Sequence, residues 1–279
     1  MLWLLLYALA QGIVQGITEW LPVSSTGHIL LLDAIWPGMQ ITLNPEFFDV
    51  FKVIIQLGSI MAVVVLYFHK LNPFSPKKSK EEQKSTWVLW SKVLVASVPA
   101  AIAGLLLDDI IDTTLSVPVV IASALILYGI GFLWLESNKN RATRVNSLEE
   151  MSYKHAFGIG AFQMLALIPG TSRSGSTILG ASLIGTSRTV AAEFSFFMAI
   201  PVMLGASGLK LLKCFMDGYF PTGDEWLVLA VATVVSFVVS LLVIRGLMAF
   251  IKKHDFKVFG WYRIVLGAVV LGCVALNWL

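Results

Sequence analysis

Six long apolar runs, separated by short polar segments, constrain this sequence more than any other feature. They cover about residues 47–68, 86–107, 117–136, 190–212, 226–251 and 259–278. A helix needs roughly 20 mainly apolar residues to cross about 30 Å of hydrocarbon. Only 13% of the residues are charged, against roughly a quarter in a soluble domain. We therefore expect an all-α polytopic membrane protein in which residues 1–279 form a single integral membrane domain.

Two further apolar stretches, at about 3–35 and 156–185, do not fit a simple crossing. Each is interrupted by a polar cluster that breaks helices, Pro22–Gly27 in the first and Pro169–Gly175 in the second. Non-helical backbone is tolerated at membrane depth only where protein or a watery cavity satisfies its polar groups. We expect each stretch to form a re-entrant helix-loop-helix hairpin beside six transmembrane helices.

The charges of the connections predict how the helices are oriented. Lysine and arginine are enriched in cytoplasmic loops, and three connections are basic. These contain Lys70, Lys77, Lys78, Lys80 and Lys84; Lys139, Arg141, Arg144 and Lys154; and Lys252, Lys253 and Lys257. The outward connections, at 108–116 and 214–225, carry only acidic charges, at Asp108, Asp109, Asp112, Asp217, Asp224 and Glu225. The net charge of +3 therefore indicates membrane orientation and not a nucleic-acid partner.

An inverted-topology repeat satisfies these constraints. The first hairpin must enter and leave from the outside and the second from the cytoplasm, so that both termini lie outside. Halves of about 1–136 and 150–279 then have opposite orientations, as in many transporters. The sequence supports the duplication weakly, since Leu21–Ser25 parallels Ile168–Ser172 within otherwise divergent halves.

The first hairpin carries polar residues suited to catalysis. Gln11, Gln15 and Glu19 recur every four residues and so share one face of a helix. The loop that follows supplies Ser24, Ser25, Thr26, Gly27 and His28. A serine alone is more often a helix N-cap. A carboxylate, hydroxyls and an imidazole together in an apolar segment indicate a functional site.

The second hairpin carries residues suited to binding an anion. Arg173 has a planar donor fork that matches phosphate oxygens, and Gly170 and Gly175 let backbone amides approach closely. Hydroxyls surround the arginine at Ser172, Ser174, Ser176 and Thr177. The alternative is an arginine that snorkels to the interface, which its place inside a Ser/Gly loop disfavours. Helices that restart at about Gly27 and Gly175 would direct positive N-terminal dipoles at one central space.

These residues predict a phosphate- or carboxylate-binding cavity near the bilayer midplane, and they do not by themselves separate hydrolysis from anion transport. Other polar residues in apolar segments are less specific. Glu193 is as consistent with lining the cavity as with an interhelical hydrogen bond. Gln163 precedes the second loop as Gln15 precedes the first. For Arg245 and Arg263, near cytoplasmic ends, we expect snorkelling or structural pairing.

Two motifs resemble the signatures of the bacterial undecaprenyl pyrophosphate phosphatase (bacitracin-resistance) family. They are Gln15-Gly-Ile-Thr-Glu-Trp-Leu-Pro-Val-Ser-Ser-Thr-Gly-His28 and Pro169-Gly-Thr-Ser-Arg-Ser-Gly-Ser-Thr177. The resemblance extends over the whole chain, through Phe51–Ser59, Glu193–Phe196 and Tyr262–Arg263. Gln15 is the allowed glutamine variant at the first position of the Glu/Gln-x-x-x-Glu motif, so Glu19 is the only carboxylate of that motif here.

The resemblance implies an enzyme that hydrolyses undecaprenyl diphosphate to the monophosphate carrier of cell-wall synthesis, at the outer face of the plasma membrane. That reaction opposes bacitracin, which captures the diphosphate. The resemblance also implies a divalent cation, Mg or Ca, with Glu19 as a ligand, because hard cations prefer oxygen. The partners are then the lipid substrate and the bilayer, and a homodimer is left open. The alternative function is a lipid-phosphate flippase or anion transporter, which the inverted repeat suggests.

The hypothesis for the reaction gives catalytic roles to Glu19, Ser25, His28 and Arg173. Ser25 is the expected nucleophile, Glu19 or His28 the base, and His28 the proton donor. The residues expected to bind substrate are Gln15, Ser24, Thr26, Gly170, Ser172, Ser174, Gly175 and Thr177. Two alternatives stay open: His28 as the nucleophile, or direct attack by a metal-activated water with Ser25 as a phosphate ligand.

Overall fold

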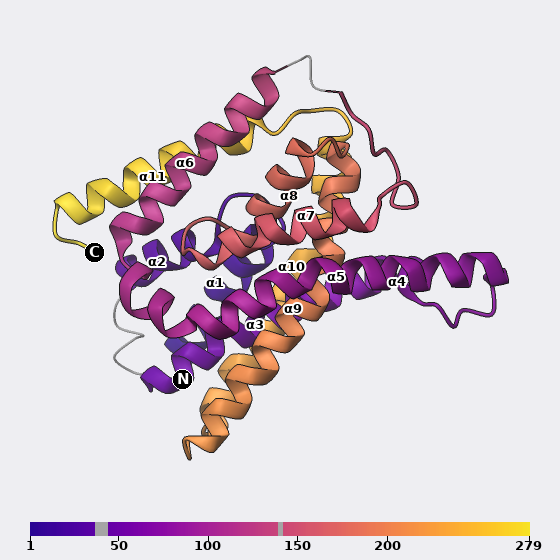
Figure 1. The fold of residues 1–279 in the computed structure, drawn as a ribbon. Coiled ribbons are helices and arrows are strands. Elements are labelled where there is room, and N and C mark those ends of the chain that lie inside the picture. The colour runs from indigo at the N-terminus through magenta and orange to yellow at the C-terminus, as the bar shows by residue number, and fades with distance from the viewer. Residues whose placement is uncertain (37–43, 139–141) are drawn as a thin grey trace.

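The computed structural model describes residues 1–36, 44–138 and 142–279, and the regular structure in these ranges is helical apart from one isolated bridge between Val145 and Thr186 (Figure 1). The helices are α1 (Leu2–Thr18), α2 (Ser25–Ile35), α3 (Pro45–Leu66), α4 (Phe68–Leu71), α5 (Lys80–Ile110), α6 (Pro118–Ser137), α7 (Tyr153–Met164), α8 (Arg173–Leu183), α9 (Arg188–Met216), α10 (Gly223–Ile251) and α11 (Lys257–Ala275). A π-helical turn, Ile111–Leu115, follows α5, and a 3-10 turn, Leu165–Leu167, follows α7.

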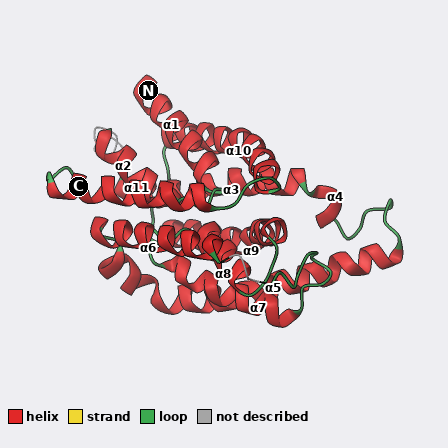
Figure 2. Ribbon diagram, turned by 90° about the horizontal axis from the view of Figure 1, so that it is seen from above, coloured by secondary structure: helices red, strands yellow, loops and turns green. Residues whose placement is uncertain are grey.

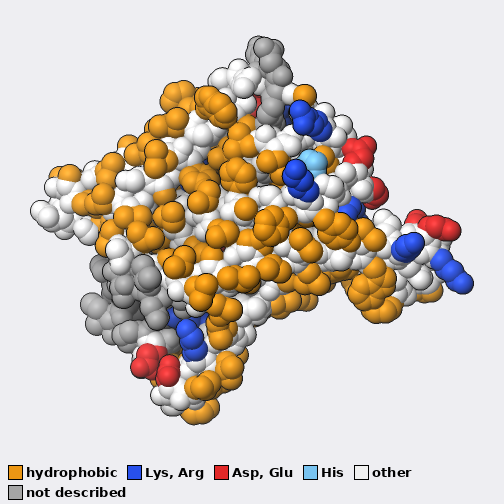
Figure 3. Space-filling view, viewed as in Figure 1, with side chains coloured by type: hydrophobic (Ala, Val, Ile, Leu, Met, Phe, Trp, Pro, Cys, Tyr) orange, Lys and Arg blue, Asp and Glu red, His pale blue; other side chains and the backbone are white. Residues whose placement is uncertain are grey.

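Among the described residues, six helices are long and apolar enough to cross a membrane: α3, α5, α6, α9, α10 and α11. They confirm the six predicted runs, with the largest difference at α5, which starts at Lys80 and not at 86. Hydrophobic side chains cover most of the face in Figure 3, and charged ones gather at its right-hand edge and in a smaller group at the lower left. This is the surface expected where lipid is the solvent.

Both interrupted stretches fold as helix, loop, helix, as predicted. In the first, the 17-residue α1 and the 11-residue α2 flank the loop at Glu19–Ser24. In the second, the 12-residue α7 and the 11-residue α8 flank the loop that contains Pro169 and Gly170. Because each arm is shorter than the roughly 20 residues of a full crossing, the two loops can lie at depth inside the helix bundle.

The packing joins elements that are far apart in sequence. The early helix α1 packs against α10, α3 against α9 and α10, and α6 along α11, while α5 packs against α7 and α9 (Figure 2). Glycines permit the closest approaches: a Cβ at Gly58 would lie 2.2 Å from the Thr233 carbonyl oxygen, and one at Gly160 would lie 2.1 Å from that of Ala96. Small residues let helix backbones approach where no hydrophobic effect drives association.

Polar contacts fix the connections at the basic side of the molecule. Arg188 pairs with Glu136 through two hydrogen bonds, and Lys92 donates to the carbonyl oxygens of Leu148 and Glu149 at 3.0 and 3.2 Å. Both cysteines are free. Lys139 and Arg141, and the side chains of Asp108, Asp109 and Asp112, were named in the orientation argument but lie outside what the structure describes.

Candidate active site

The two loops end in the same local geometry. Ser24 and Ser172 have positive φ angles of 73° and 71°, and each caps the helix that follows. The Ser24 hydroxyl accepts from the Gly27 amide at 3.5 Å, and the Ser172 hydroxyl accepts from the Gly175 amide at 3.2 Å. The helices begin at Ser25 and Arg173, two residues before the predicted positions.

This geometry corrects the internal alignment of the two loops. The sequence parallel pairs Ser25 with Ser172, whereas the N-caps pair Ser24 with Ser172 and therefore Ser25 with Arg173. The second loop has one extra residue between its proline and its cap. The second loop also contains Gly170, whose φ is +91°. A side chain is excluded there, since a Cβ would lie 2.4 Å from the Ile121 carbonyl oxygen of α6.

Glu19 and Arg173 form a buried ion pair between the loops. Arg173 Nη2 donates to Glu19 Oε1 at 3.0 Å, and the two side chains are only 11% and 5% exposed. Gln15 lies one turn before Glu19 on α1 and donates from Nε2 to Glu19 Oε2 at 2.9 Å. The predicted acidic residue and the predicted phosphate-binding arginine are thus brought together, although they are 154 positions apart.

Residues that sequence reasoning missed hold Arg173 in place. Its Nη1 donates to the backbone oxygen of Ser195 at 2.7 Å and to the Ser195 hydroxyl at 3.2 Å. Thr177 shares a 2.6 Å hydrogen bond with that hydroxyl. The guanidinium also lies 5.5 Å from the ring of Trp20, a cation–π contact. Ser195 lies within the Glu193–Phe196 stretch. A single serine in an apolar helix does not indicate by itself that it contacts an arginine.

The loops also contact each other directly. Ser174 donates from its hydroxyl to the backbone oxygen of Leu21 at 3.1 Å, and it lies 3.2 Å from the Ser172 hydroxyl. Arg263 of α11 is fully buried and donates to backbone oxygens of both loops. Of the two alternatives expected for Arg263, snorkelling is excluded, because the guanidinium is buried, and its contacts with the loops are structural. Arg245, by contrast, is exposed.

The remaining residues predicted in the first loop, Ser25, Thr26 and His28, lie in the first turn of α2. His28 contacts the Ser24 backbone oxygen through Nδ1 at 2.6 Å and the Tyr262 hydroxyl through Nε2 at 2.7 Å. A carbonyl only accepts, so Nδ1 carries the proton and Nε2 accepts from Tyr262. No hydrogen bond joins His28 to Glu19 or Arg173 in the described structure. Ser25 is half-buried at the first position of α2, and Thr26 is exposed.

Three buried polar atoms around the ion pair have no hydrogen-bond partner among the described residues. They are Gln15 Oε1, Trp20 Nε1 and Arg173 Nε. An unsatisfied buried donor or acceptor costs about 1–3 kcal/mol, so such a cluster indicates a ligand. With two guanidinium groups, one carboxylate and two helix N-termini nearby, the ligand that the charges favour is an anion.

The donors present also fit a divalent cation. Glu19 supplies carboxylate oxygens, and the unpartnered Gln15 Oε1 is a further hard ligand on the adjacent turn. Oxygen ligands are those that Mg²⁺ and Ca²⁺ prefer, and Mg²⁺ is usually bound by one or two carboxylates plus substrate phosphates. No group of three or more His, Cys, Asp or Glu occurs among the described side chains, so further ligands would come from the bound phosphates or water.

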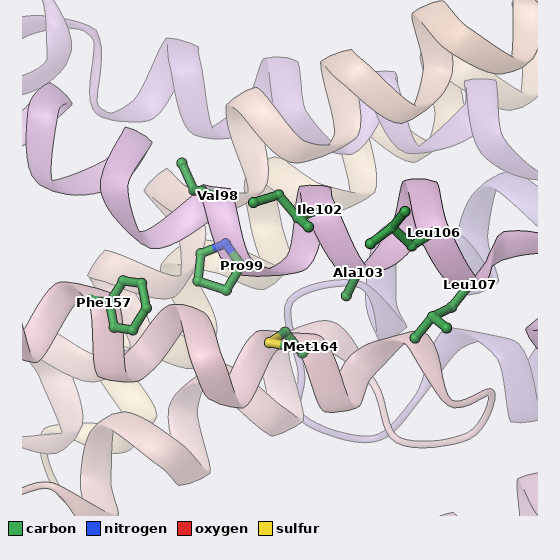
Figure 4. A pocket seen from close by; sticks show the side chains of 8 residues that line it. All are labelled: Val98, Pro99, Ile102, Ala103, Leu106, Leu107, Phe157 and Met164. Atoms are coloured by element: carbon green, nitrogen blue, oxygen red, sulfur yellow. The ribbon is translucent and has the colours of Figure 1, made fainter.

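Two other polar residues considered from the sequence form no hydrogen bond or ion pair with Glu19 or Arg173 among the described residues. Glu193 pairs with Lys70 at 2.8 Å near the basic side of the molecule. Gln163 is buried, and neither of its amide atoms has a partner in the described part of the chain. An apolar groove of about 360 Å³ lies between α5 and α7, lined by Pro99, Ala103 and Met164 among others (Figure 4). It contains none of the candidate site residues.

The fold and the site define a multi-pass membrane protein with a buried ion pair between two helix-loop-helix segments. Residues 8–269 match the family described as bacitracin resistance protein BacA, and the chain belongs to this family.

Curated relatives in the same family carry one name. The chain is 58% identical over 266 residues, covering 95% of this chain and 96% of the relative, to "Undecaprenyl-diphosphatase" of Lactiplantibacillus plantarum. It is 54% identical to the protein of that name from Enterococcus faecalis, with 95% of both chains covered. It is 56% identical to "Undecaprenyl-diphosphatase 1" of Clostridioides difficile, over 95% of this chain and 94% of the relative.

Proposed function

We propose that this protein hydrolyses undecaprenyl pyrophosphate to undecaprenyl phosphate and inorganic phosphate. The observation that carries the proposal is the buried Arg173, fixed between Glu19 and Ser195 at the start of α8. A planar guanidinium presented with helix N-terminal amides suits phosphate oxygens. The names of the relatives support this substrate, because the sequences of these relatives are more than half identical to this chain over nearly its whole length.

The phosphates bind between the two loops in this proposal. Arg173 and the first-turn amides of α2 and α8 hold the phosphate oxygens and stabilise the charge that develops on them in the transition state. The free Arg173 Nε and Trp20 Nε1 donors find acceptors on the substrate. Because Arg173 donates to both Glu19 and Ser195, its side chain is already held in one conformation.

Ser25 is the proposed nucleophile. Its Oγ attacks the terminal phosphorus, its proton passes to a base, and the bridging oxygen leaves with the lipid monophosphate. Water then cleaves the phosphoserine, which releases inorganic phosphate and restores the hydroxyl. Glu19 or His28 is the proposed base, and His28 the proposed proton donor. Both groups already accept hydrogen bonds, Glu19 from Gln15 and Arg173 and His28 Nε2 from Tyr262.

A divalent cation, Mg or Ca, is part of the proposal, with Glu19 and Gln15 as its protein ligands. When bound, it neutralises phosphate charge and orients the diphosphate. Glu19 Oε1 accepts from Arg173 Nη2, so the residue that would hold the cation and the residue proposed to bind phosphate are linked through one hydrogen bond.

We further propose that α1–α2 and α7–α8 are re-entrant hairpins in an inverted-topology repeat, with the site open to the outer face. The contacts support this arrangement, because they occur in matched pairs: α1 with α10 and α7 with α5, then α3 with α10 and α9 with α5. The same operation relates α2 with α11 to α8 with α6. Recycling of the lipid carrier at that face would oppose bacitracin.

The second candidate function is a lipid-phosphate flippase or anion transporter. The matched helix contacts favour it, since many transporters bind substrate where two inverted repeats meet. A transporter moves its substrate between compartments without breaking a bond. Phosphate release in detergent, where there is no second compartment, therefore separates the two functions.

The deciding experiment measures phosphate release from undecaprenyl or farnesyl diphosphate by the purified protein in detergent, with Mg or Ca and with a chelator. We expect release that the chelator abolishes and that Arg173→Lys lowers about 100-fold or more, the typical loss when a transition-state donor is removed. Lysine keeps the buried charge beside Glu19, whereas an uncharged residue would leave that carboxylate unpaired at about 3–5 kcal/mol.

Arg245→Lys is the matched control, because Arg245 is exposed and remote from both loops in sequence. It should leave release unchanged. No release from folded wild-type protein, or full activity in Arg173→Lys, would contradict the proposed phosphatase.

A further inference from the structure

Arg263 is the one buried arginine in the structure that no carboxylate contacts, among the residues described. It is 0% exposed, on the second turn of α11. Its Nη1 donates to the Pro22 oxygen at 3.1 Å, and its Nη2 donates to the oxygens of Gly170 and Thr171, each at 2.9 Å. One guanidinium thus contacts the backbone of both loops.

The opposite side of the guanidinium is anchored to the helix pair α6 and α11. Arg263 Nε lies 3.4 Å from the Leu125 oxygen, and the group stacks 5.4 Å from the Tyr128 ring, both on α6. These two helices pack closely, since a Cβ at Gly129 would lie 2.7 Å from the Gly260 oxygen. A closely packed helix interface allows little relative movement of its two helices. Arg263 therefore connects a rigid pair of helices, α6 and α11, to two irregular loops.

The contact also reaches the start of α8. A Cβ at Gly175 would lie 2.9 Å from Arg263 Nη1, so the guanidinium lies directly against the turn that carries Arg173. The loops also meet through the Ser174 contact with Leu21, the Glu19–Arg173 pair and the stacking of Arg173 on Trp20. Moving either loop by one ångström would lengthen hydrogen bonds that are already close to 3 Å, and these weaken quickly with distance and angle.

We propose that Arg263 is a positioning residue that fixes the two loops relative to each other and so sets the spacing between Glu19 and Arg173. This inference rests on the proposed function only for its effect on the reaction. The geometry needs the planar fork of arginine, whose separate donors reach carbonyls on different loops. An ammonium is a single point of charge and cannot contact Pro22 and Gly170 in the same way.

The first test is amide hydrogen exchange of the detergent-purified protein without substrate, which does not depend on any activity. Arg263→Lys should accelerate exchange at least tenfold in peptides covering both 20–28 and 168–178. Exchange in α6 and α11 should stay within twofold of wild type. The matched control, Arg245→Lys, should leave both loops unchanged. Protection of both loops equal to wild type in Arg263→Lys would overturn the proposal, as would loosening of α6 and α11 alone.

A second variant keeps the test decisive if lysine prevents folding. Arg263→Met removes the buried charge together with its desolvation cost. Replacing buried charged groups by hydrophobic residues of similar volume often leaves folding stability unchanged. It leaves the Pro22, Gly170 and Thr171 oxygens without their donor. The same paired loss of protection in the two loops is expected, and protected loops in a folded Arg263→Met protein would again contradict a positioning role.

The kinetic test uses farnesyl diphosphate and the amount of folded protein measured separately. Loops out of register should lower kcat about 10- to 100-fold and change KM less than about threefold, since misplacement affects the transition state more than the ground state. A purely structural role would reduce folded protein but leave its kcat unchanged. If wild type releases no phosphate, the proposed function fails, while the exchange experiment still decides the role of Arg263.

Discussion

The Glu19–Arg173 pair explains why this site is buried and charged at once. Removing two charges from water costs several kcal/mol per ion, and their mutual attraction restores this only when further hydrogen bonds satisfy both groups. Gln15 and Ser195 supply such bonds, one to each partner. Even so, Arg173 Nε and Gln15 Oε1 stay unsatisfied in the described structure. The residual cost is consistent with a site selected for its ligand and not for stability.

At the scale of single residues, the nucleophile gives the sharpest prediction. Ser25 stands at the first position of α2, half-buried, where an attached phosphate would face the helix N-terminus. Acid quenching during turnover should trap a phosphorylated enzyme, and peptide mass spectrometry should place the phosphate on Ser25. Ser25→Ala should lose at least about 100-fold of kcat, as expected for an essential nucleophile.

Two outcomes would replace Ser25 in this role. An acid-labile phosphate that maps to His28 would assign the nucleophile to the imidazole. A fully active Ser25→Ala protein would leave direct attack by water, with Ser25 as a phosphate contact at most. Ser174→Ala is a useful comparison, because its hydroxyl binds the Leu21 oxygen and should not carry phosphate.

The sequence predicted some of these residues and missed others for a physical reason. Glu19, Arg173 and the loop serines stand out because polar groups are costly in an apolar segment. Ser195 gives no such signal, since its only distinction is a contact made across 22 positions by the folded chain. Arg263 did give a signal, but a charge close to a helix start is compatible with snorkelling until the direction of its side chain is known.

At the scale of elements, the two loops are built on one local solution. Ser24 and Ser172 adopt φ angles of 73° and 71°, which L-residues rarely accept, and each cap turns an apolar arm into a new helix. Glycine would adopt the positive φ without strain but has no side-chain oxygen for the cap. Serine supplies that oxygen, and its backbone strain costs about 1–3 kcal/mol.

Substitutions at Ser172 should separate these two effects. Ser172→Gly removes the cap but relieves the positive φ, whereas Ser172→Ala removes the cap and keeps the strain. Loss of a serine cap to alanine costs about 1 kcal/mol, and to glycine only a few tenths. We therefore expect Ser172→Ala to lower the midpoint of thermal unfolding in detergent by about 2–4 °C and Ser172→Gly to lower it less. Equal losses, or a larger loss with glycine, would show that φ is not a constraint there.

At the scale of the whole molecule, six apolar runs predicted six membrane-length helices, but not which helices pack together. Span length follows from composition, because hydrocarbon tolerates only continuous apolar helix. Partners such as α1 with α10 depend on where glycines remove side chains, as at Gly12, where a Cβ would lie 2.6 Å from the Ala232 oxygen. That complementarity exists only between two surfaces, and neither surface can be recognised alone.

The proposed inverted topology can be tested by the side on which single cysteines react. In a protein with Cys214 and Cys273 replaced by alanine, Lys77→Cys and Lys253→Cys should be protected from an impermeant maleimide in intact cells, and Asp217→Cys should react. All three positions are exposed in the structure, so a failure to react reports the membrane side. Positions that label only after lysis are cytoplasmic, as the lysine-rich connections predict.

Comparing the labelling of Lys77→Cys with that of Lys253→Cys tests whether α7–α8 crosses the membrane. Four of the six candidate crossings, α5, α6, α9 and α10, lie wholly between these residues, and α7–α8 lies among them. An even number of crossings returns the chain to the same side, so the two cysteines agree only if α7–α8 enters and leaves on one side. Opposite labelling would mean that this segment crosses the membrane, which would contradict the proposed re-entrant hairpin. A cysteine added before Met1 tests α1–α2 in the same way: it should react in intact cells, opposite to Lys77→Cys, if that hairpin is also re-entrant.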